Sequence, residues 1–248
     1  MDTHRIGCSE IWGGVRSIDL DVCTGGLTAS VYSRACDGDA GGDIYYLSVC
    51  SSDRLTRIAL ADVRGHGGQV SQISSWIYDS LKLKMNTLDG AGVLADLNNQ
   101  IYRHGLEAMT TASVVGYYIT ESRLYFSYAG HSPALLWRRA EKKWELLPLS
   151  RTGGTANMVL GVLPSACFDQ EHTPFASGDR FILYTDGVTE CPDKNGDEFG
   201  LHRMADALEQ ADGDSLRNIK SSVVEALRRH AAPEQSHDDI TFMIAEIR

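Results

Sequence analysis

The chain has 248 residues, of which 43% are hydrophobic and 23% charged, an ordinary composition for a globular protein of one or two domains. Its net charge of −10 repels phosphate backbones and argues against nucleic acid as a ligand. It suits a protein that gathers cations or meets basic partners, although simple solubility explains it equally well. No apolar run reaches the roughly 18 residues of a membrane span.

The six cysteines form no C-x-x-C pair and no group with zinc-site spacing. The first ten residues lack the basic and apolar regions of a signal peptide. We therefore expect reduced thiols and a cytoplasmic protein.

Hydrophobic periodicity predicts the elements after residue 26, while the polar, glycine-rich segment 1–26 stays unassigned. In the first helix Val70, Ile73, Ile77 and Leu81 recur at steps of three and four. Alternating β-branched and aromatic residues indicate the strands. In chain order the predicted elements are a strand at 27–35, hairpin strands at 44–50 and 55–62, helices at 69–88 and 92–104, a β-meander over 111–148, strands near 158–163, 166–173 and 179–185, helices at 200–211 and 214–230, and a strand at 240–247.

This order is not the βαβα alternation of a parallel sheet. It predicts an α+β fold in which two mostly antiparallel sheets carry helices on their outer faces. No linker or repeat interrupts the chain, so we expect 27–248 to be a single domain.

Two carboxylates mark one end of the first hairpin. Asp43 precedes its first strand, Asp62 ends its second, and the midpoint between them falls in the turn. Residues equidistant from an antiparallel turn face each other, with Cβ atoms about 4.5–5.5 Å apart. Carboxylates held that close need a positive charge between them, and Mg²⁺ or Mn²⁺ would supply it. From spacing alone, ordinary strand-end turn residues remain an alternative.

A second group of acids follows the same logic. Asp186 ends an apolar strand, and Asp238 and Asp239 begin the last one. If these two strands are antiparallel neighbours, their aspartates share an end. Each motif alone is weak, but together they supply the four strand-end positions that a two-metal site requires.

Glycines surround a histidine directly after Asp62. Gly65, Gly67 and Gly68 allow backbone to approach a ligand closely. His66 could protonate a leaving oxygen, or it could be a helix residue without a chemical task. For His131 we expect a structural role.

Several motifs together resemble the PPM (protein phosphatase 2C-like) serine/threonine phosphatases. Within them the sequence is similar to the bacterial branch typified by stage II sporulation protein E and the stress-response sigma-factor regulators. The matching segments occur in the family's order: GGDIYY (41–46), ADVRGHG (61–67), MTTASVVGYYI (109–119), YAGHSPALLW (128–137), LGV (160–162), ILYTDGVTE (182–190), EFG (198–200) and HDDITFMI (237–244).

The resemblance implies an αββα sandwich with two divalent cations, Mn²⁺ or Mg²⁺, at one edge. It implies that Asp43 and Asp62 bind metal with help from the Val63 carbonyl. It assigns Asp186 and Asp238 to the second ion, with Asp238 ranked above Asp239. A water or hydroxide bridging the metals would then attack phosphoserine or phosphothreonine in line.

The resemblance also suggests partners. A phosphorylated protein, such as an anti-sigma-factor antagonist, would be the substrate, and a separate activator protein could dock on the helices at 69–88 and 92–104. Two departures bear on activity: Tyr46 stands where the family often has an acid, and Arg64 replaces a small or apolar residue. The alternative reading is a catalytically weak pseudo-phosphatase that acts as an interaction module.

Overall fold

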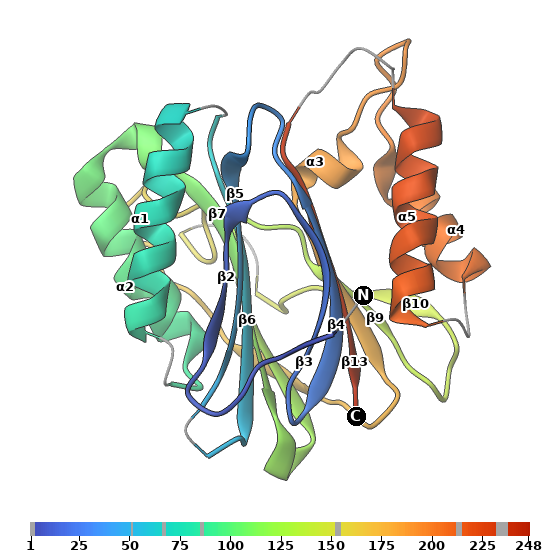
Figure 1. The fold of residues 1–248 in the computed structure, drawn as a ribbon. Helices are drawn as coiled ribbons and strands as arrows, with labels where there is room; N and C mark the ends of the chain where they lie inside the picture. Colours follow the sequence, from blue (N-terminus) through green and yellow to red (C-terminus); the bar gives the residue numbers. More distant parts are fainter. Residues whose placement is uncertain are drawn as a thin grey trace.

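Two β-sheets pack face to face, and a pair of helices covers the outer face of each (Figure 1). All sheet pairings except that of β1 with β3 are antiparallel among the described residues. This confirms the predicted α+β fold and αββα sandwich. The computed structural model describes residues 3–50, 52–65, 68–84, 87–151, 155–211, 215–231 and 238–248.

The strands of each sheet come from distant parts of the chain. The first sheet has the order β1 (His4–Arg5), β3 (Ile18–Cys23), β4 (Leu27–Arg34), β13 (Ile240–Ile247), β12 (Arg180–Tyr184), β9 (Ala134–Trp137) and β10 (Trp144–Leu147). The second has the order β11 (Glu171–Pro174), β8 (Arg123–Ala129), β7 (Thr110–Tyr118), β6 (Leu55–Val63), β5 (Ala40–Val49) and β2 (Ile11–Arg16).

Two of the long helices, α2 and α5, begin where the sequence supplies a cap. The Asp89 side chain accepts a hydrogen bond from the Gly92 N–H, and the Ser215 side chain accepts one from Asn218, which satisfies amide groups that a helix start leaves open. The helices are α1 (Gly68–Lys84), α2 (Gly90–His104), α3 (Asp186–Thr189), α4 (Gly200–Gln210) and α5 (Leu216–His230), with short 3₁₀ turns at Leu106–Ala108 and Ile119–Glu121.

Three apolar layers hold the sandwich together. One fills the space between the sheets, a second lies under α4 and α5, and a third lies under α1 and α2. Strand β5 is buried along almost its whole length, because the facing sheet covers one side and the helix pair the other. Its nearly continuous apolar run follows from this position.

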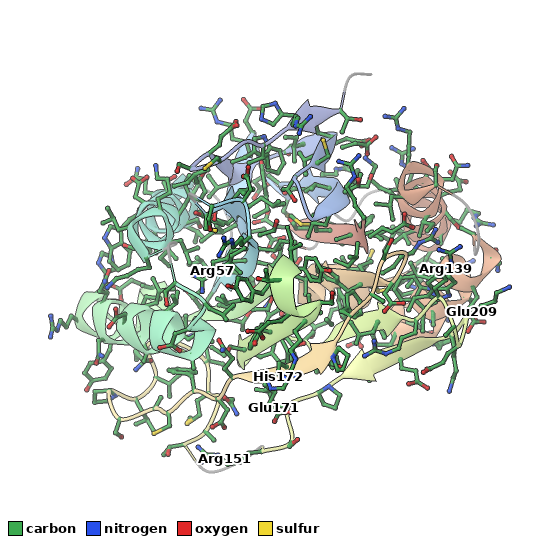
Figure 2. The ribbon with its side chains drawn as sticks, turned by 90° about the horizontal axis from the view of Figure 1, so that it is seen from below. Arg57, Arg139, Arg151, Glu171, His172 and Glu209 are labelled. Carbon is green, nitrogen blue, oxygen red and sulfur yellow. The ribbon has the colours of Figure 1, made fainter. Side chains whose placement is uncertain are left out.

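An arginine lies in the layer under α1 and α2. Arg57 of β6 is 1% exposed, and its Nη1 donates to the carbonyl oxygen of Lys84 at the end of α1 over 3.4 Å. Figure 2 labels it on the side of the second sheet that faces these helices. Burial is the main cause that lowers the pKa of Arg57 to about 10.

The structure corrects two predicted strands. The segments 158–163 and 166–173 contain only isolated bridges at Leu160 and Cys167 before the short β11 begins. Asn157 and Gly161 have φ values of 56° and 87°, which interrupt an extended chain however apolar the residues between them are. The structure also adds β1, β2 and β3 within the segment that the sequence left unassigned, and they join both sheets.

Candidate metal centre

The first hairpin brings its two aspartates together as the spacing predicts. Asp43 of β5 and Asp62 of β6 are directly paired in the antiparallel register. Asp43 is 3% exposed, and its Oδ2 accepts a hydrogen bond of 2.9 Å from Thr185 Oγ1 of the facing sheet. The Asp43 carboxylate therefore lies between the two sheets.

The second group of acids meets the first at the same end of the sandwich. β12 and β13 pair antiparallel, with Tyr184 opposite Phe242. Asp186 follows β12 as the first residue of α3, which lies at the upper end of the sandwich in Figure 1. Asp238 lies two residues before β13 begins at Ile240.

Negative charge accumulates around Asp62. Its pKa is raised to about 8, first by burial and then by the charges of Asp186 and Asp238, with smaller effects from Asp239 and Glu190. Burial and the neighbouring Asp62 also hold the pKa of Asp43 well above its ordinary value. No described Lys or Arg forms an ion pair with either of these two carboxylates.

Asp239 differs from its neighbour because its carboxylate binds backbone. Its Oδ1 accepts from the Cys36 N–H at 2.6 Å, and its Oδ2 accepts from the Gly42 N–H and, at 3.4 Å, from the Asp43 N–H. These bonds fasten the loop that leads into β5. The contacts thus give Asp239 a structural task and leave Asp238 as the better candidate ligand.

Small residues permit this close packing. A Cβ at Gly41 would lie 2.1 Å from Asp239 Oδ2, and one at Gly187 would lie 2.0 Å from the Asp239 carbonyl oxygen. A Cβ at Gly42 would lie 2.7 Å from the Val63 carbonyl oxygen. That carbonyl, named as a candidate ligand from the sequence, therefore faces the strand that carries Asp43.

Three other residues that the sequence singled out are His66, Arg64 and Tyr46. His66 lies outside the described residues. Arg64 is exposed, and its backbone N–H donates to the Met109 carbonyl at 2.9 Å. Tyr46 is fully buried under α1, with its ring 6.0 Å from that of Tyr78.

His131 is 8% exposed, and its Nδ1 lies 2.8 Å from Thr111 Oγ1. Thr111 belongs to β7 and is the residue paired with Asp62 of β6. Burial lowers the pKa of His131 to about 4, so it is neutral near pH 7.

Sequence reasoning missed the hydroxyls that support the site. Thr185 donates to Asp43 and accepts at 3.1 Å from the Thr241 N–H, which links β12, β13 and β5. It also missed Glu190, whose charge raises the pKa of Asp62. Both Thr185 and Glu190 fall inside the motif at 182–190 that contains Asp186, and membership of this motif was the available signal.

The donor chemistry fits a hard divalent cation. Carboxylate oxygens and a backbone carbonyl are the ligands that Mg²⁺ and Mn²⁺ prefer. In the described parts of the chain no three His, Cys, Asp or Glu side chains are gathered tightly enough to coordinate one ion as they stand. Repulsion between carboxylates nevertheless adds to burial in raising the pKa of Asp43 and Asp62, and a bound cation would relieve that repulsion.

Comparison with known proteins identifies the family of the chain. The model of the family "Stage II sporulation protein E (SpoIIE)" matches residues 52–248. The phosphoserine phosphatase RsbU of Bacillus subtilis (strain 168) is 26% identical over 223 residues, which are 87% of this chain and 61% of that protein. The chain thus spans about three fifths of the length of this relative.

No described helix is long and apolar enough to cross a membrane.

Solved structures share the fold. The SiaA-PP2C domain of Pseudomonas aeruginosa superposes with a TM-score of 0.76 at 20% identity, over 89% of this chain and 86% of that one. RsbX in complex with magnesium superposes with a TM-score of 0.69 at 18% identity, over 93% of this chain and 100% of that one. The chain therefore belongs to the stage II sporulation protein E family, is homologous to RsbU and shares its fold with the SiaA-PP2C domain.

Proposed function

We propose that the chain hydrolyses phosphoserine or phosphothreonine on a regulatory protein, using two divalent cations, Mn²⁺ or Mg²⁺. The observation that carries this proposal is the pairing of Asp43 with Asp62 at the end of the sandwich that also holds Asp186 and Asp238. Burial, and then the charges of Asp186 and Asp238, raise the pKa of Asp62 to about 8 there. These four aspartates are the proposed metal ligands, and the Val63 carbonyl assists them. Membership of a phosphatase family supports the same chemistry.

Each residue has a defined task in this proposal. Bound cations would lower the pKa of a water molecule and offset the charge of the phosphate. Thr185 holds the Asp43 carboxylate in place, and Asp239 fixes the loop before it. His66 is the proposed proton donor to the leaving oxygen, because an imidazole titrates near the working pH.

The substrate is proposed from the relative. RsbU is named a phosphoserine phosphatase, and we extend this to a phosphorylated partner-switching protein, such as an anti-sigma-factor antagonist, in the cytoplasm. A separate activator would bind α1 and α2. Support comes from Ser74 of α1, whose hydroxyl donates to the Gly42 carbonyl at 3.1 Å, so that α1 is tied to the residue beside Asp43.

The test is phosphate release from a phosphoserine peptide and from p-nitrophenyl phosphate, with Mn²⁺ and with excess EDTA. We expect turnover that requires Mn²⁺ and falls at least about 100-fold in Asp62→Asn, since a metal ligand is lost. Asp206→Asn, which changes an exposed aspartate of α4, is the matched control and keeps full activity. Turnover that survives EDTA would refute metal dependence.

A second function is kept open by Tyr46, which stands where relatives often carry an acid. If the protein binds Mn²⁺ without turning over either substrate, alone or with its activator, it acts as a pseudo-phosphatase and interaction module. Calorimetric Mn²⁺ titration of wild type and Asp62→Asn separates this case from a protein that binds no metal.

A further inference from the structure

Two thiols meet where the N-terminal segment passes from one sheet to the other. β1 pairs with β3 in the first sheet, and β2 pairs with β5 in the second. Cys8 lies in the turn between β1 and β2, and Cys50 directly follows β5. Ile6, just before this turn, is 2% exposed and belongs to the core between the sheets, so the crossing is part of the packed structure.

The backbone register brings the two cysteines opposite each other. The Ser9 N–H donates to the Val49 carbonyl at 3.1 Å, and the Val49 N–H donates to the Glu10 carbonyl at 3.3 Å. Ser9 has φ of 63°, so this is a bulge in which two residues oppose one. One step further along each chain are Cys8 and Cys50.

The side chains confirm that they are neighbours. The Cys8 thiol donates to the carbonyl oxygen of Cys50, with 3.6 Å between Sγ and O. Cys8 is exposed and Cys50 partly buried. Opposed residues of antiparallel chains have Cα atoms about 4.5–5.5 Å apart, which lies within the range of about 4.4–6.8 Å that disulfides span between Cα atoms.

Hydrogen bonds also surround the Cys50 thiol. Its Sγ lies 3.2 Å from the Ser52 hydroxyl and accepts from the Leu55 N–H at 3.2 Å. Burial alone would raise the pKa of Cys50, but these hydrogen bonds and those from neighbouring amides outweigh it and lower the pKa. A thiolate is the form that attacks oxidants. Cys191 contrasts with it, because it is buried and its pKa is raised.

We propose that Cys8 and Cys50 form a site of reversible oxidation that closes an intramolecular disulfide. The Cys50 thiolate attacks hydrogen peroxide and becomes a sulfenic acid, releasing hydroxide, which takes up the thiol proton as water. The Cys8 sulfur then attacks the Cys50 sulfur, and the second oxygen leaves as water. In total two thiols lose two electrons and two protons, and one peroxide becomes two waters.

The disulfide would fasten the crossing between the sheets. It joins residues 42 apart in sequence, and this loop contains β2, β3, β4 and β5. Closing such a loop restricts the unfolded chain and stabilises the folded one. Cys50 is seven residues from Asp43 along an extended strand, a distance of about 23 Å. The disulfide would therefore stabilise the edge of the sandwich without changing the proposed metal centre.

The experiment oxidises the full-length protein with hydrogen peroxide, alkylates the remaining thiols and maps the peptides by mass spectrometry. Trypsin leaves Cys36 and Cys50 on one peptide, so a protease that cuts before aspartate is added to separate them. We expect one Cys8–Cys50 cross-linked peptide and alkylated thiols elsewhere. The oxidised protein should also unfold several degrees higher, and dithiothreitol should reverse this shift.

Two variants give the matched comparison. Cys8→Ser should lose the cross-link and the thermal shift and leave Cys50 reactive toward a sulfenic-acid probe, whereas Cys36→Ser should keep the cross-link. Both substitutions replace sulfur by oxygen at partly exposed positions, so folding is retained. The proposal is overturned if Cys50 is recovered as an alkylated thiol, or is linked to Cys36 or to a second molecule.

Discussion

Neutralising Asp62 should make the metal-free protein more stable while it abolishes activity. Asp62 is surrounded by the charges of Asp186 and Asp238, and its pKa is raised to about 8. In the unfolded chain an aspartate has an ordinary pKa, near 3.8. Between these two values the folded state holds a proton that the unfolded state releases. Stability contributed by the protonated group is therefore lost as pH rises from about 4 to about 8.

The magnitude follows from this difference in pKa. With 1.36 kcal/mol per pKa unit, the free-energy penalty of the Asp62 carboxyl is about 4 kcal/mol at pH 7 and about 1.5 kcal/mol at pH 5. Asparagine has the same shape and does not titrate, so Asp62→Asn removes up to this amount. For a chain of this size about 1 kcal/mol shifts the unfolding midpoint by 2–4 °C.

The assay is thermal unfolding in EDTA at pH 5, 6 and 7, compared with Mn²⁺ at pH 7. In EDTA the Asp62→Asn protein should unfold at a higher temperature than wild type, and the gap should widen with pH. In Mn²⁺ the order should reverse, because wild type alone gains the binding energy of the metal. Asp206→Asn is the control and should follow wild type. A variant no more stable than wild type in EDTA at pH 7 would refute the reasoning.

Three further pairs of substitutions test the supporting contacts. Asp239→Ala should lower the free energy of unfolding by about 3 kcal/mol, because backbone amides lose their acceptor. Asp238→Ala should lower it by less than about 1 kcal/mol and should instead raise the Mn²⁺ concentration that activity requires. Gly41→Ala should destabilise the protein by about 2 kcal/mol, since its Cβ would meet Asp239 Oδ2 at 2.1 Å. Gly25→Ala should be nearly neutral, because its Cβ would lie 3.9 Å from the Asp53 carbonyl oxygen. Denaturant unfolding measures both. Arg57→Met should change stability by less than about 1 kcal/mol because Arg57 Nε has no described partner, but Arg57→Ala should cost about 3 kcal/mol by leaving a cavity.

The parts of the site that the sequence predicted are those that depend on local geometry. Asp43 and Asp62 belong to one hairpin, so counting from the turn is enough to pair them. The four long helices were predictable because their apolar faces repeat every three to four residues. Family motifs then related Asp186 to Asp238, whose strands lie far apart in the chain.

Other features depend on contacts that no local pattern encodes. Asp239 binds Cys36 and Gly42 across about two hundred residues of sequence, so only the folded chain distinguishes it from Asp238. Strands β1 to β3 are short, partly exposed elements with little apolar alternation, and they lie at or next to a sheet edge. The segment 158–163 is misleading for the opposite reason, because it is apolar and buries Leu160 in the core without forming a strand.

The departure at Tyr46 can now be interpreted from the pleat of β5. Side chains of a strand alternate between its two faces, so residues three apart point in opposite directions. Asp43 points between the sheets toward Thr185, whereas Tyr46 points toward α1 and contacts Tyr78. Tyr46 therefore changes the packing beneath α1 and leaves the carboxylates around Asp62 intact. An effect of Tyr46 on activity would have to act through α1, which Ser74 ties to the Gly42 carbonyl beside Asp43, and this favours a phosphatase with retained chemistry over an interaction module.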